Sequence, residues 1–254
     1  MKKIILLLNI VWLFSASILF SQVNIENIFT EANELYNEGK YNEAITYYNK
    51  IIKSEFHSAE LYYNLANTYY KLDSIPSSVY YYEKALKLNP NDKDIIDNLR
   101  LVNKTLVDDI EPIADPLIES MLSRISNIFY FETWGYISIA FSFLIIALFL
   151  TYYCSNDSKI KRITFINLCI SFILMSITLV NGYKGYNNHI NIEYAIIFSY
   201  ETDLKTEPNN RSETLFMLHE GTKVQLLENY NNWIKIQLVN GQIGFIQLID
   251  AKIL

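Results

Sequence analysis

The stretch LYYNLANTYY, residues 61–70, places four tyrosines around a single alanine, Ala66. An earlier segment of the chain carries the same residue types at the same spacing. The matched pairs, all at one constant offset, are Ala32 with Ala66, Asn33 with Asn67, Tyr36 with Tyr70, Tyr47 with Tyr81, and Tyr48 with Tyr82. Asn64 and Leu65 recur at the same offset as Asn98 and Leu99. A repeat of this kind indicates that most of the tyrosines pack repeated units together, rather than serving catalysis.

The offset, a period of about 34 residues, resembles that of the tetratricopeptide (TPR) repeat, a helix–turn–helix unit with small and aromatic residues at fixed spacing. The second repeat fills the pattern nearly throughout, with Ser78 where Ala is usual. The first repeat departs from it at Glu31 and Phe56, where Leu and Pro are usual. The residues expected to pack the helices together are Ala32, Leu35, Gly39, Ala44, Tyr48, Tyr62, Leu65, Ala66, Tyr69, Tyr82, Ala85 and Pro90.

A further helix is expected after Pro90, because Asn91 and Asp92 are residue types that cap a helix start. We expect it to close the stack, so that residues 22–110 form one TPR module. The TPR resemblance implies a groove that binds peptides or partner proteins. The candidate partner-binding residues there are the polar and aromatic ones outside the packing register; the alternative is that they are ordinary solvated positions. They are Asn33, Asn64, Asn67, Tyr70 and Asn98.

The composition narrows the class of protein. About half of the 254 residues are apolar (51%). The net charge of −6 lacks the excess of basic residues that is typical of proteins that bind nucleic acids. The acidic residues gather in 22–133, as on a solvated surface. The two cysteines, Cys154 and Cys169, lie in or beside apolar segments and are expected to be small apolar fillers rather than a disulfide framework.

The chain opens with two lysines and an apolar run that ends before Ser21, which predicts a signal peptide over 1–21. Two later segments, 134–153 and 163–183, are apolar over about the 20 residues that a membrane helix needs. The loop between them, 154–162, holds Lys159, Lys161 and Arg162.

Because basic loops stay in the cytoplasm, the loop 154–162 is predicted to be cytoplasmic. The N- and C-terminal soluble regions are then periplasmic, as the signal peptide also requires. This topology places the chain in the inner membrane with two spans. Apolar residues at helical spacing in 111–133 predict an amphipathic linker helix, either at the membrane interface or packed on the TPR module.

After a linker at 184–191, the pattern changes to a period of two over residues 192–254. We expect about five short strands, with Ile234, Ile236 and Leu238 in the core. Asn240-Gly241 predicts a type I′ hairpin turn, and Glu220-Gly221 a second turn.

The segments LHEGTKVQLLE (218–228) and NWIKIQLVNGQIGFI (232–246) resemble a bacterial SH3-like (SH3b) domain, which implies a small all-β barrel. Trp233 falls where that family carries its common Trp. The resemblance implies binding of peptides or cell-wall components, with Trp233 a further candidate partner-binding residue. The alternative is that the Trp233 ring packs over the barrel's own edge.

No phosphate-binding or nucleophile-elbow motif is present, and His57, His189 and His219 lie in separate segments without metal-ligand spacing. The sequence therefore predicts no enzyme, no catalytic residue, no metal and no cofactor. An undetected hydrolase would need a nucleophile and a base in reach of each other.

The order of segments, with NPNDKDIIDNLRLVNKTLVDDIEP (89–112), resembles the BatE family, the TPR-containing branch of the Bat (aerotolerance) operon proteins. The resemblance implies an envelope protein that acts beside von Willebrand-type membrane proteins and a MoxR-type AAA+ ATPase. The fold class expected is a multidomain membrane protein: an α-helical TPR solenoid, two transmembrane helices and a small all-β SH3-like barrel. Its function is predicted to be that of a scaffold for envelope proteins. The alternative is an envelope sensor whose SH3b domain binds peptidoglycan or a cell-wall peptide.

Overall fold

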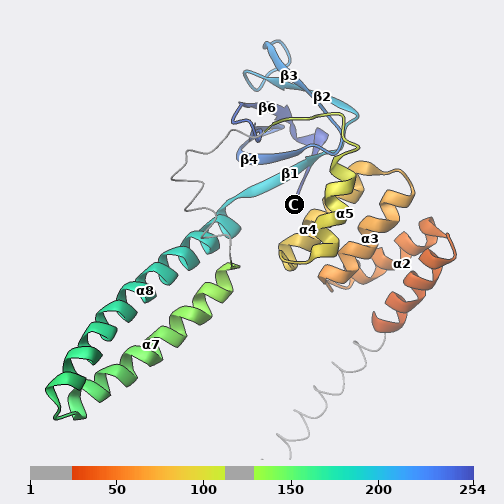
Figure 1. Cartoon of the computed structure of the whole chain (residues 1–254). Coiled ribbons are helices and arrows are strands. Elements are labelled where there is room, and N and C mark those ends of the chain that lie inside the picture. Colours follow the sequence, from red (N-terminus) through yellow and green to blue (C-terminus); the bar gives the residue numbers. More distant parts are fainter. Residues whose placement is uncertain (1–24, 112–128) are drawn as a thin grey trace, which may run out of the picture. The chain divides into compact units, whose positions relative to one another are not determined.

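The computed structural model describes residues 25–111 and 129–254 (Figure 1). The predicted signal peptide, 1–21, and most of the predicted amphipathic helix, 111–133, lie outside the described residues. The chain divides into two compact units. Unit 1 joins the segment that ends at Ile110 to Tyr194–Leu238 and Ile243–Leu254, and unit 2 holds Glu111–Glu193 with Val239–Gln242. Unit 1 is therefore discontinuous in sequence.

Unit 1 begins with antiparallel helices. Residues 25–37 are helical, and four helices follow: α2 (Tyr41–Lys53), α3 (Ala59–Lys71), α4 (Ile75–Leu88) and α5 (Lys93–Asn103). The Ser58 side chain accepts a hydrogen bond from the Leu61 backbone N–H at 3.1 Å and so caps α3. Asp92 caps α5 in the same way, through the backbone N–H groups of Asp94 and Ile95. Each such cap stabilises a helix by about 1 kcal/mol.

The helices approach closely where the repeat carries small residues. Eight of the twelve residues expected in packing roles are buried: Ala32, Ala44, Tyr48, Tyr62, Leu65, Ala66, Tyr82 and Ala85. Leu35, Tyr69 and Pro90 are partly exposed. Ser78, which replaces the usual Ala, is fully buried, and its hydroxyl has no hydrogen-bond partner in the described parts of the chain.

Gly39 does not pack between helices, which corrects the sequence-based expectation. It is exposed, and no atom lies within 4 Å of the position that a Cβ would take. Its φ of +78° is one that only glycine adopts readily, so its place in the repeat is set by the turn before α2.

The C-terminal part of unit 1 is an antiparallel sheet. Its strands are β1 (Glu193–Ile197), β2 (Glu201–Lys205), β3 (Thr214–His219), β4 (Lys223–Tyr230), β5 (Trp233–Gln237), β6 (Ile243–Gln247) and β7 (Ala251–Ile253), with a 3₁₀ turn, η1 (Leu248–Asp250), before β7. The seven strands lie in the order β3-β2-β6-β5-β4-β1-β7, two more than expected. Among the described residues no pairing joins β3 to β7, so the sheet is open rather than a hydrogen-bonded barrel.

The core of this sheet follows the predicted period of two. Ile234 and Ile236 are fully buried and Leu238 is 2% exposed, which confirms the predicted core face of β5. Glu220-Gly221 forms the predicted turn, with Gly221 at φ +87°.

The type I′ turn predicted at Asn240-Gly241 is wrong. A type I′ turn needs positive φ at both central residues, and here only Gly241 has it. The register pairs Gln237 with Ile243, so five residues form the loop, and Asn240 Oδ1 accepts a hydrogen bond from the Gln242 backbone N–H. The two-residue turn in this sheet is at Asn231-Asn232, where Tyr230 pairs with Trp233 and Asn231 has φ +53°.

Unit 2 contains a hairpin of two long helices, α7 (Phe131–Cys154) and α8 (Ser158–Asn191). Both are long and apolar enough to cross a membrane, by length and composition, with mean hydropathy of 2.2 and 2.3 over their most apolar windows. Both extend beyond the predicted spans 134–153 and 163–183. The non-helical link between them is only 155–157, shorter than the predicted loop 154–162.

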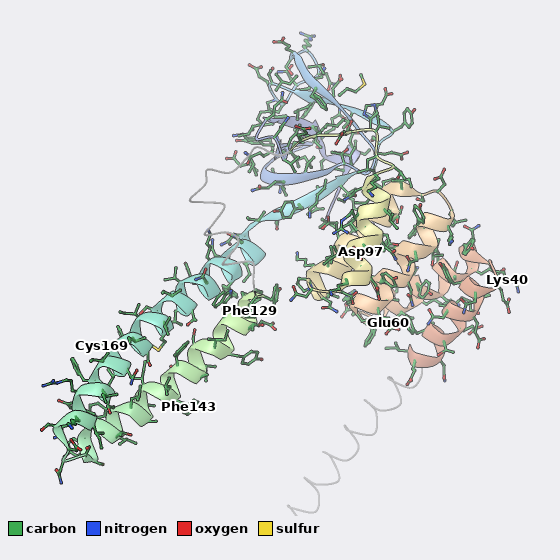
Figure 2. The ribbon with its side chains drawn as sticks, viewed as in Figure 1. Lys40, Glu60, Asp97, Phe129, Phe143 and Cys169 are labelled. Carbon is green, nitrogen blue, oxygen red and sulfur yellow. The ribbon has the colours of Figure 1, made fainter. Side chains whose placement is uncertain are left out.

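Small residues bring these two helices together. A Cβ on Gly185 would lie 3.0 Å from the Cβ of Phe131, and the hydroxyls of Ser138 and Thr178 are hydrogen-bonded at 2.8 Å. Contacts of this kind are typical of helices that pack within a membrane. Phe143 and Cys169, labelled in Figure 2, are exposed on the hairpin. Both cysteines are free and exposed on the hairpin, so neither fills a buried space within the described residues.

Candidate functional site

Asparagine and tyrosine side chains link neighbouring repeats of unit 1. The Tyr48 hydroxyl, on α2, donates to Asn33 Oδ1 at 2.6 Å. Asn64 Nδ2, on α3, donates to the same oxygen at 3.0 Å. Burial raises the pKa of Tyr48, so its hydroxyl keeps the proton that it donates.

The same arrangement recurs one repeat later. The Tyr82 hydroxyl donates to Asn67 Oδ1, and burial likewise raises the Tyr82 pKa. Asn98 Nδ2 donates to Asn67 Oδ1 at 3.3 Å and to the Tyr63 hydroxyl at 2.9 Å. We call these linked side chains the Asn–Tyr ladder: Asn33, Tyr48, Asn64, Tyr63, Asn67, Tyr82 and Asn98.

The ladder gives four of the five candidate groove residues a structural contact that sequence reasoning missed. A buried tyrosine hydroxyl needs a hydrogen-bond partner. The side-chain oxygens of Asn33 and Asn67 supply one each. The available signal was that the pairs Asn33/Asn67, Tyr48/Tyr82 and Asn64/Asn98 share one period, because residues that repeat together occupy equivalent places in successive repeats.

A hollow of about 290 Å³ lies beside the second half of the ladder. We call it the tyrosine groove; its lining residues are Tyr36, Tyr63, Asn67, Tyr70, Lys71, Tyr82, Asn98, Leu101 and Val102. Three of the candidate residues, Asn67, Tyr70 and Asn98, therefore come together in one place. Asn33 instead lines a separate hollow of about 790 Å³ with Phe29 and Phe56.

The groove combines aromatic surface with unused hydrogen-bonding capacity. Tyr70 is 40% exposed, and Lys71 is the single charged residue of the lining. Within residues 25–111 and 129–254, Asn67 Nδ2 and Asn98 Oδ1 carry no hydrogen bond to protein. One donor and one acceptor on neighbouring carboxamides match the carbonyl and N–H of an extended peptide.

Trp233 lines a second hollow, of about 530 Å³, on the sheet. We call it the Trp233 pocket; its lining residues are Glu201, Thr202, Asp203, Lys205, Asn210, Met217, Trp233, Gln247 and Asp250. Trp233 is at the start of β5, where it pairs with Gln247 of β6. Its ring is only partly buried, so part of it is available to a ligand.

The Trp233 pocket carries excess negative charge. Lys205 Nζ pairs with Asp203 at 2.9 Å, and Asp250 accepts hydrogen bonds from Ser199 and Thr202. Glu201 is half exposed and lies 4.0 Å from His219 Nε2. An aromatic face beside carboxylates favours an amine-bearing ligand, since both attract a cation.

The described parts of the chain bring no three His, Cys, Asp or Glu side chains together in a metal-binding group. His57 Nδ1 contacts the Tyr62 hydroxyl at 2.6 Å, and His219 contacts Asp108. These two histidines lie at separate sites. One contacts a tyrosine and the other an aspartate, so neither of these contacts pairs a histidine with a serine or cysteine nucleophile.

Comparison with known families agrees with this architecture. Residues 25–57 and 59–92 match tetratricopeptide repeat families, and residues 201–248 match the bacterial SH3 domain. The chain thus contains TPR repeats and a bacterial SH3 domain, modules that are typically non-catalytic and mediate interactions. It combines them with two helices long and apolar enough to cross a membrane. None of the curated proteins matches this chain.

Proposed function

We propose that the protein is a membrane-anchored scaffold that binds partner envelope proteins through its TPR and SH3 modules. One observation carries the proposal: two modules of interaction type lie in one compact unit, and each has an open hollow with aromatic and polar lining. Partially exposed aromatics with spare polar groups are typical of protein-binding hot spots.

The discontinuity of unit 1 supports the proposed membrane topology. Its two segments must lie on one side of a membrane, so the chain between them has to cross an even number of times. Helices α7 and α8 supply two crossings. Lys159, Lys161 and Arg162 lie next to the hairpin turn, which favours a cytoplasmic turn and a periplasmic unit 1 at the inner membrane.

The partners follow from the groove and from the resemblance to the BatE family. The tyrosine groove suits an extended segment with apolar or aromatic side chains, because tyrosine is the most frequent residue of its lining and the lining carries one charge. We propose that the periplasmic region of a von Willebrand-type membrane protein of the Bat group supplies that segment, within a Bat/MoxR-associated complex.

The second candidate function is that of an envelope sensor. The carboxylates beside Trp233 favour it, because cell-wall peptides present amino groups that such a pocket binds. In this case the SH3 module binds peptidoglycan or a cell-wall peptide, and the two spans transmit its occupancy.

The two functions separate by substitution in the full-length protein. Tyr70→Ala removes an exposed groove aromatic outside the ladder, and Trp233→Ala removes the aromatic of the other pocket. Tyr200→Ala is the matched control, since Tyr200 is 74% exposed and lines neither hollow. Proteins co-purified from membranes are identified by mass spectrometry, and binding to purified cell wall is measured by sedimentation.

A scaffold loses its partner with Tyr70→Ala and keeps it with Tyr200→Ala. A sensor loses cell-wall binding with Trp233→Ala. Undiminished partner recovery and cell-wall binding in a folded Tyr70→Ala, Trp233→Ala double variant would contradict both functions.

A further inference from the structure

The chain that leaves α5 lies against the SH3 module of the same unit. We call residues 105–110 the strap. They are not part of a helix or strand, yet alternate residues face the module. Leu106, Asp108 and Ile110 are partly buried, whereas Val107 and Asp109 are exposed. This period of two is that of an extended peptide with one side against a surface.

The centre of the contact is a buried carboxylate. The Asp108 side chain is only 4% exposed. Its Oδ2 accepts from the His219 backbone N–H at 2.8 Å and from the Thr222 hydroxyl at 2.6 Å. Its Oδ1 lies 2.6 Å from His219 Nδ1. A buried carboxylate needs several donors, and the turn between β3 and β4 supplies all three.

Apolar contacts flank the carboxylate on both sides. Gly221 lies in the same turn, and a Cβ there would overlap with Leu106 Cδ2. The absence of a side chain at position 221 therefore makes room for Leu106. Ile110 packs against the buried cluster of the sheet, which includes Ala195 and Val224. The three strap residues that face the module, Leu106, Asp108 and Ile110, are thus apolar, acidic and apolar in turn.

Helix α4 adds contacts of a different kind. Lys223 Nζ, on β4, pairs with Glu83 at 2.6 Å, and the rings of Tyr80 and Phe198 meet edge to face at 5.9 Å. Ile196 belongs to the same buried cluster as Tyr80, Val79 and Ala85. The strap is thus one part of a larger apolar interface, and a test has to isolate its contribution.

We propose that residues 105–110 are an intramolecular peptide ligand of the SH3 module, recognised at the β3–β4 turn through the pattern Leu-x-Asp-x-Ile. Asp108 is the specificity-determining residue, because it alone of the strap satisfies three donors of the turn. The site is occupied by the chain itself, so the SH3 module is fixed to the TPR module. The Trp233 pocket is left for other ligands; His219 lies between the two sites, 4.0 Å from Glu201 of that pocket.

The test is hydrogen exchange measured by mass spectrometry on the full-length protein in lipid nanodiscs. The variants are Asp108→Ala and, as matched control, Asp109→Ala at the exposed neighbouring position. Loss of a buried, charged hydrogen-bonding group raises the local opening equilibrium by about tenfold or more. We expect this rise in exchange at residues 105–110 and at 219–222 in Asp108→Ala, and no change in Asp109→Ala.

Thr222→Val keeps the test decisive if Asp108→Ala fails to fold. It removes one donor on the SH3 side at nearly constant volume. Exchange should then rise in the strap, which is distant in sequence but in direct contact with Thr222 through Asp108. Equal exchange in Asp108→Ala and Asp109→Ala, or an unchanged strap in Thr222→Val, would overturn the proposal. Partner binding through the tyrosine groove is read separately, so its loss or retention does not affect this result.

Discussion

Tyr48 donates its hydroxyl to Asn33 Oδ1 at 2.6 Å, and Tyr82 makes the equivalent bond to Asn67 one repeat later. The two tyrosines are among the largest fully buried side chains of the protein's described residues. Each asparagine also accepts from an asparagine of the following repeat. The hydrogen bonds between asparagine and tyrosine side chains therefore recur from repeat to repeat, as the buried apolar residues do.

Removing the Asn67 side-chain oxygen, which accepts the hydrogen bond from Tyr82, should destabilise the fold. Asn67→Ala leaves the Tyr82 hydroxyl without its acceptor, and an unsatisfied buried donor costs about 1–3 kcal/mol. The measurement is the free energy of unfolding by urea on the full-length protein. Asn42→Ala, at an exposed position of α2, is the control and should change little. A double-mutant cycle with Tyr82→Phe should show non-additive losses; strictly additive losses would contradict the ladder.

Enlarging a small packing residue should also destabilise the repeats. Ala66 is fully buried on α3, so Ala66→Leu forces extra methylene groups into a filled space and should cost about 1–3 kcal/mol. The readout is the melting temperature followed by circular dichroism. An unchanged melting temperature would show that the register assigned to this repeat is wrong.

Ser78→Ala should have the opposite sign. The Ser78 hydroxyl is buried without a partner among the described residues, so its removal at almost constant volume should stabilise the protein by about 1 kcal/mol. The neighbouring Ser77 is the matched control, because its hydroxyl is bonded to that of Ser74 at 3.0 Å. Ser77→Ala should be neutral or mildly destabilising. A loss of stability in Ser78→Ala would point to a partner for that hydroxyl.

Reporter fusions should distinguish the two faces of the membrane. Alkaline phosphatase is active only outside the cytoplasm, so we expect activity for fusions at Lys104 and Leu254 and none at Asp157, in the hairpin turn. A green fluorescent protein fused at the same positions serves as the reciprocal control. Activity at Asp157 with none at Leu254 would reverse the proposed orientation.

Periodic features of this protein could be predicted from sequence, whereas contacts between distant segments could not. The helical repeat and the alternation of Ile234, Ile236 and Leu238 are visible locally and correspond to buried faces. The strands β2 and β7 were missed because Glu201–Lys205 and Ala251–Ile253 are short and carry charges. Helix α8 continues past the apolar span through polar residues up to Asn191, which extend the helix without being apolar.

The candidate sites show the same difference between residue positions, which the sequence predicts, and contacts between distant residues, which it does not. Asn67 and Asn98 were expected to contact a partner, and they line the groove; their shared repeat period marks equivalent positions but does not by itself show that the two side chains bond to each other. A carboxamide has the same composition whether it binds a ligand or a neighbouring helix. Asp108 was not singled out at all, since its partners lie 111 and 114 residues further along the chain.

The 111-residue separation of Asp108 and His219 has a consequence for biogenesis. The strap is made before the hairpin helices, and its site on the sheet only after both have been synthesised. Until the C-terminal strands reach the same compartment, the Asp108 carboxylate of a nascent chain accepts hydrogen bonds from water instead of from the β3–β4 turn. In the proposed topology, a chain with a single inserted helix would have its two halves on opposite sides of the membrane, and the apolar faces around Ile196 and Ile110 would be exposed to proteolysis. We therefore expect the completed interface to distinguish correctly inserted chains from such chains.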